Sequence, residues 1–290
     1  MTPLLNTLIL LAWYAGHCEL WTATINRLYS YPLPFARLRR FRRVHDLALV
    51  AFPLILVGWI GLSSPGVLVG GRWADLLMAW KVYFGVCSVG AASLVIHAIR
   101  RAIRRPPREE VGYESRVIDV AAELGGRPIG DGPHQGMARM WFNETFELDL
   151  TTRTLAPARL PSKWDGLSIV QLSDLHLTGS VDRPYFDEVV RRAAECEPDL
   201  VVCTGDLVDD IKLLDWLPAT LGRLDARLGC WFILGNHDWH ARPETIRETM
   251  VGLGWHDVAG GCRRIEHRGR ILAIGGSERP WMGDHPDFST

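Results

Sequence analysis

The sequence predicts an α/β protein whose N-terminus consists of apolar helices. Long apolar stretches without charged residues dominate the first 105 residues, and a strand, loop and helix pattern repeats from residue 167 onward. Polar side chains follow the ends of the predicted strands. We therefore expect a membrane domain at residues 1–105, a connector at 106–166 and an α/β domain at 167–290.

The membrane domain is predicted from three segments that are long enough to cross a bilayer. Residues 1–18, 47–71 and 82–99 contain no Asp, Glu, Lys or Arg. A helix needs about 20 mainly apolar residues to span the hydrocarbon layer. Three such segments in a row disfavour buried helices of a water-exposed domain. We therefore expect about three transmembrane helices.

The placement of arginines predicts the orientation of these helices. One arginine lies between the second and third segments, whereas six lie in the first loop and five follow the third segment (Arg27, Arg37, Arg39, Arg40, Arg42, Arg43; Arg100, Arg101, Arg104, Arg105, Arg108). The positive-inside rule places both arginine-rich regions in the cytoplasm. The sequence thus predicts a multi-pass membrane protein whose α/β domain is cytoplasmic.

The connector is predicted to hold a β-hairpin. The sequence Arg105-Pro-Pro-Arg ends the third apolar helix, because proline cannot continue a helix. Short apolar alternations at residues 117–120 and 142–150 predict two strands that pair with each other. No group of catalytic side chains stands out in this part.

The α/β domain is predicted from alternating apolar runs and helical patterns. Apolar runs that are typical of buried strands are followed by helical spacing of apolar residues. The expected strands are 167–172, 200–203, 230–234 and 270–275, and the expected helices are 184–195, 211–224 and 243–253.

Candidate metal ligands follow three successive strands of this domain. Asp174 and His176 follow the first strand, Asp206 follows the second, and Asn236-His237-Asp238 follow the third. In open α/β sheets the carboxyl ends of the strands form the ligand-binding edge. One such residue alone is more often a turn former or a helix cap. Together they form a mixed oxygen and nitrogen set, which suits Zn²⁺, Mn²⁺ or Fe.

These motifs resemble the signature blocks of the calcineurin-like metallophosphoesterases, in particular the membrane-linked branch. The resemblance rests on Asp174-Leu-His176, Thr204-Gly-Asp-Leu-Val-Asp and Gly235-Asn-His-Asp238, and it covers about the last 120 residues. It implies a β-sandwich flanked by helices and two divalent metal ions. Asp174 and His176 would bind the first metal, Asp206 would bridge both, and Asn236 would bind the second.

The resemblance also implies the reaction and the catalytic residues. A metal-bound hydroxide would attack a phosphate mono- or diester, because two cations can hold both the ester and the nucleophile. His237 would stabilise or protonate the phosphoryl oxygens, and Asp238 would orient its ring.

Two alternatives stay open at this point. The family's later histidine blocks do not occur before Thr290, so we expect a domain that is incomplete at its C-terminus. The alternative to an enzyme is a catalytically incomplete, membrane-tethered binding domain. Membrane attachment makes a lipid-linked phosphate ester one hypothesis for the substrate, and a water-soluble ester fits equally well. A formal net charge of −1 gives no reason to expect nucleic-acid binding.

Overall fold

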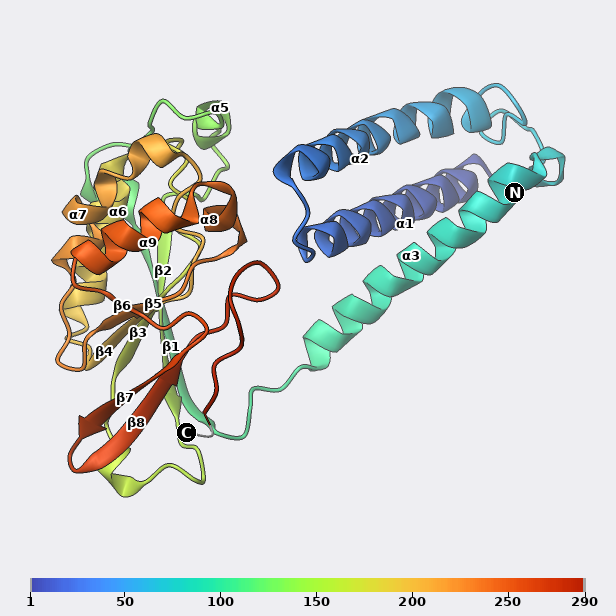
Figure 1. The fold of residues 1–290 in the computed structure, drawn as a ribbon. Coiled ribbons are helices and arrows are strands. Elements are labelled where there is room, and N and C mark those ends of the chain that lie inside the picture. Colours follow the sequence, from blue (N-terminus) through green and yellow to red (C-terminus); the bar gives the residue numbers. More distant parts are fainter. Residues whose placement is uncertain (1, 289–290) are drawn as a thin grey trace. The chain divides into compact units, whose positions relative to one another are not determined.

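The computed structural model describes residues 2–288. The chain divides into two compact units, Met1–Pro106 and Pro107–Thr290. Figure 1 draws the first unit in blue to teal and the second in green to red. The first unit is helical, and the second combines three β-sheets with helices.

The N-terminal unit is built from three long helices. Helix α1 contacts both α2 and α3. A Cβ atom added to Gly16 of α1 would lie 1.8 Å from the carbonyl oxygen of Cys87 in α3, so these two helices approach each other closely at this glycine. Close contacts through small residues are typical of helix packing in membranes. The helices are α1 (Pro3–Tyr29), α2 (Phe35–Ile55) with its π-helical continuation η1 (Leu56–Gly61), and α3 (Met78–Ile103), which the short helix η2 (Trp73–Asp75) precedes.

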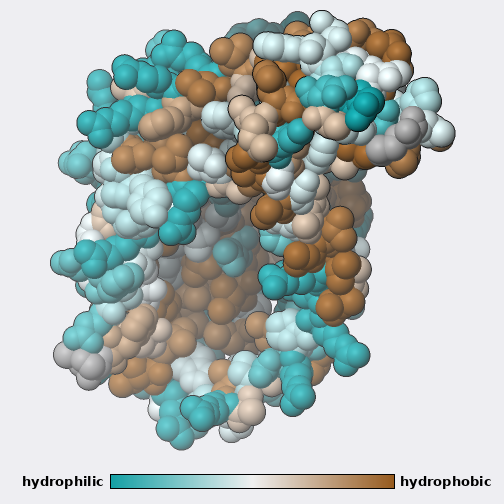
Figure 2. Space-filling model, turned by 90° about the vertical axis from the view of Figure 1, so that its right-hand side faces the viewer, coloured by the Kyte–Doolittle hydropathy of each residue, from teal (hydrophilic) through white to brown (hydrophobic). Residues whose placement is uncertain are grey.

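Among the described residues, two helical segments are long and apolar enough to cross a membrane. These segments are Phe35–Gly61 and Met78–Ile103, and only 28% and 17% of their most apolar windows are buried. Figure 2 shows hydrophobic side chains at the surface of the face that it draws. Length and composition are weak support by themselves, but the low burial differs from that of a core helix. Helix α1 covers the first of the three expected spans. It is long enough to cross a membrane but is not one of these two segments.

Helix α1 buries two polar residues, Asn6 and His17. The side chain of Asn6 donates a hydrogen bond to the carbonyl oxygen of Val67 at 2.6 Å and accepts one from the indole of Trp73 at 2.9 Å. His17 is buried, and its ring contacts the hydroxyl of Tyr83 and the carbonyl oxygen of Ala48. The polar atoms of both side chains therefore have partners inside the unit.

The second unit begins with an antiparallel pair of strands in the connector. Strand β1 (Glu110–Asp119) pairs with β2 (Glu147–Leu155). The residues between them form two short helices, α4 (Val120–Glu123) and α5 (Gln135–Ala138). In Figure 1, α5 and the first residues of β1 lie toward opposite ends of this unit.

A four-stranded parallel sheet forms the centre of the second unit. Its strands are neighbours in the same order as in the sequence, β3-β4-β5-β6. A separate antiparallel hairpin, β7-β8, follows. The strands are β3 (Ile169–Leu172), β4 (Leu200–Cys203), β5 (Cys230–Phe232), β6 (His256–Asp257), β7 (Cys262–His267) and β8 (Arg270–Gly275), and the main helices are α6 (Arg183–Glu195) and α9 (Pro243–Gly252).

The two faces of the parallel sheet are covered differently. Val201 and Phe232 belong to one apolar cluster with side chains of α6 and α9. Trp231, whose side chain points to the other face because strand residues alternate, clusters with Ile265 of β7 and Ile274 of β8. The α/β class is therefore present, with helices on one face and a β-hairpin on the other. The complete β-sandwich stays a prediction.

The helix expected at residues 211–224 is wrong as a continuous element. The chain instead forms three short turns of helix. Pro218 has no N–H to donate and Gly222 is a poor helix former, so neither supports an uninterrupted helix. These turns are η4 (Ile211–Leu213), α7 (Trp216–Ala219) and η5 (Leu221–Arg223).

A buried ion pair fixes the segment after β8, and its loss should destabilise this unit. Arg247 of α9 bonds to Glu278 at 2.7 Å and to Asp257 at 2.6 Å, and the Glu278 side chain is only 2% exposed. Arg247→Met leaves a buried carboxylate without its cation, which costs about 3 kcal/mol or more. We expect the melting temperature to fall by about 6–12 °C. Arg263→Met, at an exposed position of β7, is the control, and an equal shift in both variants would contradict this prediction.

Candidate metal centre

Three of the candidate ligands meet at the carboxyl edge of the parallel sheet. Asp174 and His176 lie in the loop after β3, and Asp206 lies in the loop after β4. Because β3 and β4 are parallel neighbours, these loops leave the sheet at the same edge. One ligand atom from each residue lies within 4.8 Å of the others.

The backbone holds these three residues in an unusual conformation. Their φ angles are 56° for Asp174, 45° for His176 and 57° for Asp206, all in the left-handed region. Residues other than glycine adopt this region rarely and at an energetic cost. The backbone N–H of Asp174 bonds to the carbonyl oxygen of Gly205 at 3.1 Å, and that of His176 bonds to the carbonyl oxygen of Asp206 at 2.9 Å. Strain of this kind is concentrated at functional sites.

The side-chain geometry fits a cation. Nε2 of His176 lies 3.6 Å from Oδ1 of Asp174 and 4.0 Å from Oδ2 of Asp206. Atoms that share a metal ion at about 2.1 Å can be at most about 4.2 Å apart, and both separations are below that limit. Two carboxylates and one imidazole facing one point form a donor set for a divalent transition metal.

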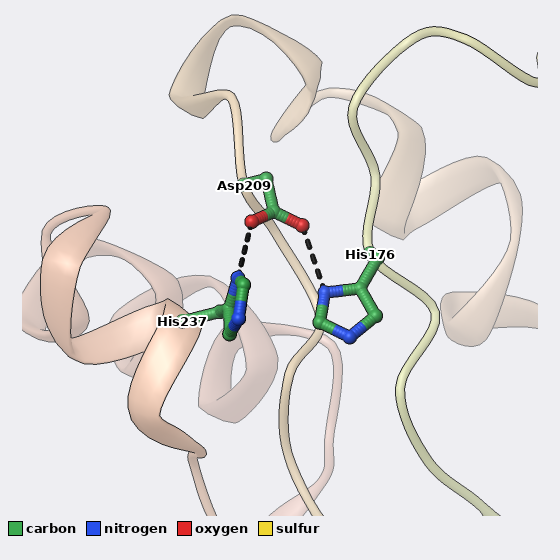
Figure 3. Close-up of side chains that lie close together, drawn as sticks. All are labelled: His176, Asp209 and His237. Carbon is green, nitrogen blue, oxygen red and sulfur yellow. Dashed lines mark hydrogen bonds and ion pairs between the residues drawn. The ribbon is translucent and has the colours of Figure 1, made fainter. Parts of the chain in front are cut away.

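Asp209 connects the two histidines of the site. Its Oδ2 lies 2.9 Å from Nδ1 of His176, and its Oδ1 contacts Nδ1 of His237. Figure 3 shows the carboxylate between the two rings, with one oxygen directed toward each. The ring centroids are 4.5 Å apart. The sequence prediction did not include Asp209, although it is the second acidic residue of Thr204-Gly-Asp-Leu-Val-Asp, and this spacing was the available signal.

The Asp209 carboxylate shifts the pKa values of both neighbouring histidines. The hydrogen bonds that Nδ1 of each ring donates to the Asp209 carboxylate raise the pKa of both His176 and His237. Burial raises the pKa of the Asp209 carboxyl, but its bonds to the two rings outweigh this effect and hold the pKa well below its usual range. The carboxylate therefore keeps an N–H on Nδ1 of each ring. Nε2 is then the ring nitrogen that can bind a cation or exchange a proton.

Asp238 has a different position from the predicted one. It is fully buried, and its carboxylate accepts backbone N–H bonds at 2.8–3.0 Å from residues 206, 207, 208 and 235. Its oxygens thus stabilise two loops of the site, while Asp209 contacts the His237 ring. The prediction that Asp238 orients His237 through a side-chain contact is corrected accordingly. The physical reason is that the tight turn after β5 directs the Asp238 side chain into the protein.

Asn236 and His237 lie in the first turn of α8 (Asn236–His240), directly after β5. The backbone N–H of His237 bonds to Oδ1 of Asp206 at 2.9 Å, which joins this turn to the candidate cation site. Gly235, just before them, is in close contact with Asp206, because a Cβ atom at Gly235 would lie 2.1 Å from Oδ1 of Asp206. Only glycine fits here without displacing that carboxylate.

A comparison with protein families identifies this part of the chain. Residues 167–287 match the family profile described as calcineurin-like phosphoesterase. This segment belongs to that family. The match includes all of the clustered site residues and covers the parallel sheet and the β7-β8 hairpin. The sequence-based recognition of a calcineurin-like metallophosphoesterase is therefore confirmed.

Several curated proteins resemble this calcineurin-like segment. The chain is 41% identical over 92 residues to a transmembrane protein with metallophosphoesterase domain from Bos taurus, which covers 31% of this chain and 21% of that protein. It is 37% identical over 123 residues to the UDP-2,3-diacylglucosamine pyrophosphatase LpxG from Chlamydia muridarum, covering 38% of this chain and 37% of that protein. An uncharacterized metallophosphoesterase from Aquifex aeolicus is 40% identical over 142 residues, which is 48% of this chain and 54% of that protein.

The matched segments are partial. They span between about a fifth and about half of the length of these curated relatives. No solved structure matches the chain with significance. The comparisons thus establish the family of the α/β part, and relatives named as transmembrane proteins share it.

Proposed function

We propose that this protein is a membrane-anchored, metal-dependent phosphoesterase that hydrolyses a phosphate mono- or diester. The convergence of Asp174, His176 and Asp206 on one point carries this proposal, because their separations fit a shared cation. The family match supports the reaction class. The β3-β6 sheet and the β7-β8 hairpin would then belong to the β-sandwich of this family.

Each side chain of the centre has a distinct role in this proposal. Asp174, His176 and Asp206 would hold a first cation, and Asp206 and Asn236 would hold a second. Asp209 is a positioning residue, because its bond to Nδ1 directs Nε2 of His176 toward the carboxylates. Asp238 acts on the structure of the loops alone.

His237 is the proposed acid of the reaction. Its Nδ1 is held by Asp209, so a proton on Nε2 can be donated to an oxygen of the ester. Divalent cations (Mn²⁺, Zn²⁺ or Fe) would supply charge stabilisation for the phosphoryl group and acidify water. No Ser or Cys nucleophile is needed for such chemistry.

The membrane helices favour a substrate that is attached to lipid. Phe35–Gly61 and Met78–Ile103 would hold the phosphoesterase at the membrane, and the arginines at and beyond the end of Met78–Ile103 support a cytoplasmic location for it. LpxG, a relative of this chain, is named as a pyrophosphatase of a diacylated sugar nucleotide. A lipid-linked phosphate ester is therefore the proposed substrate class.

Hydrolysis by the protein in detergent tests the proposal. We expect cleavage of bis(p-nitrophenyl) phosphate or p-nitrophenyl phosphate that stops with EDTA and returns with Mn²⁺, because the cations stabilise the transferring phosphoryl group. Mn²⁺ binding is measured by calorimetry on the same preparation.

Each outcome of these two measurements has a definite meaning. Cation binding together with Mn²⁺-dependent hydrolysis supports the enzyme. Cation binding without hydrolysis of either ester favours the membrane-tethered binding domain. Hydrolysis that is unaffected by EDTA contradicts a metal-dependent reaction.

A further inference from the structure

A short segment that begins with the last two residues of α5 exposes large apolar side chains to water. The exposed fractions are 60% for Met137, 45% for Met140, 86% for Trp141 and 63% for Phe142. We call residues 137–142 the apolar loop. Exposed apolar residues that are contiguous in this way mark contact sites on proteins.

The fold itself presents these side chains outward. The guanidinium of Arg127 donates to the backbone carbonyl oxygens of residues 138–141, at 2.9 Å for Met140. The amide of Asn143 donates to the carbonyl oxygen of Met137 at 2.8 Å. Ala138 is buried and anchors the turn. Polar bonds to the backbone therefore fix the apolar loop while its large side chains stay in solvent.

The composition of the apolar loop matches a membrane interface. Trp and Phe are favoured at the headgroup level, where their rings bury apolar area next to a polar layer. Met adapts to irregular apolar surroundings. Arg139 is the charged residue within the loop, and residues 132–143 contain no Asp or Glu. This charge is complementary to anionic phospholipid headgroups.

The chain connection makes such contact possible. Residues 104–109 join the end of α3 to the start of β1, and six residues reach at most about 20 Å. The apolar loop lies beyond the other end of β1, which has 10 residues and so spans about 33 Å. With the β1-β2 pair lying along the bilayer, the linker and the apolar loop would both reach its surface.

The apolar loop is also connected to the candidate metal centre. The segment that leads into α5 bonds to the loop that follows His176: the N–H of Gly132 donates to the carbonyl oxygen of Gly179 at 2.7 Å, and the N–H of His134 donates to Oγ of Ser180 at 3.2 Å. These bonds join the segment before the apolar loop to the part of the chain that carries His176.

We propose that the apolar loop inserts into the headgroup layer of an anionic phospholipid bilayer. It forms a second membrane contact besides the N-terminal helices, and it holds the phosphoesterase segment against the surface. The proposal rests on the membrane attachment of the N-terminal unit. It is independent of whether the metal centre is catalytic.

A fluorescent probe at residue 141 tests this contact in the full chain. Trp141→Cys is labelled with a nitrobenzoxadiazole maleimide, and Val251→Cys, a 52% exposed position of α9, serves as the matched control. Both are made after replacing Cys18, Cys196 and Cys262, which are not buried, by alanine. Each labelled protein is reconstituted into nanodiscs that contain phosphatidylcholine alone or with phosphatidylglycerol, and co-elution with the discs verifies attachment.

The expected result is specific to the apolar loop. Nitroxide-labelled lipid should quench the probe at residue 141 in anionic discs, and quenching by aqueous iodide should be at least about threefold weaker there than at residue 251. Arg139→Glu should reduce the lipid quenching. Equal iodide quenching at both positions overturns the proposal. Shielding from iodide without lipid quenching also overturns it, because the loop then contacts protein, such as a second copy of the chain.

Discussion

Asp206→Asn should reduce the metal-dependent turnover by at least about a hundredfold. Even the loss of a partner outside the first coordination sphere lowers metal affinity or activity by about 10- to 100-fold. One carboxylate oxygen of Asp206 lies 4.0 Å from Nε2 of His176, and the other accepts the backbone N–H of His237 at 2.9 Å. An amide keeps an oxygen for the N–H bond but loses the negative charge that a pair of cations requires. The measurement is the initial rate with Mn²⁺, together with Mn²⁺ affinity by calorimetry.

The folded structure should survive the Asp206→Asn substitution. A loss of turnover in the folded variant would then reflect the chemistry of the site and not unfolding. We expect the melting temperature of Asp206→Asn without metal to stay within about 3 °C of the parent protein, which corresponds to about 1 kcal/mol. Asp215→Asn is the matched control, because Asp215 precedes α7 without a side-chain cap bond, and it should keep full turnover. Mn²⁺-dependent turnover that Asp206→Asn leaves unchanged would remove Asp206 from the proposed centre.

Asp238→Ala should strongly destabilise the second unit. Its carboxylate accepts four backbone N–H groups inside the protein. Each buried donor without a partner costs about 1–3 kcal/mol, so a loss of about 3 kcal/mol or more is expected. The melting temperature should fall by about 6–12 °C or more, as measured by thermal unfolding in detergent.

The comparison of two acidic residues makes this prediction specific. Asp209→Ala removes a carboxylate that contacts the side chains of His176 and His237. Its effect should therefore fall on metal affinity and turnover more than on the melting temperature. If Asp209→Ala lowers the melting temperature as much as Asp238→Ala does, the structural role assigned to Asp238 is contradicted.

The sequence pattern was sufficient to predict the elements that carry the site. Apolar runs predicted β3, β4 and β5, and the spacing of Phe186 and Val190 predicted α6 almost to its ends. Parallel strands force their carboxyl ends to one edge, so Asp174, His176 and Asp206 were expected to meet there. Their separations bear out that proximity, while their roles stay proposals.

The roles of Asp209 and Asp238 could not be separated from sequence alone. Both residues follow glycine-containing turns. Their positions in the sequence allow either carboxylate to contact the His237 ring. The direction of each carboxylate depends on the left-handed backbone of Asp206 and on the turn at Gly235, which are products of tertiary packing. Likewise, hydropathy showed that α1 is apolar but not that Asn6 and His17 have partners inside the helical unit.

The bond between Asp238 and the backbone of Asp206 has a consequence for the order of assembly during synthesis. Asp174, His176 and Asp206 leave the ribosome before residue 238, but the loop of Asp206 has its N–H partner only once Asp238 has been made. The cation site therefore gains this bond only after residue 238 has left the ribosome. A metal ion bound at the proposed centre would stabilise the folded state that contains this bond, so we expect metal binding to be coupled to folding.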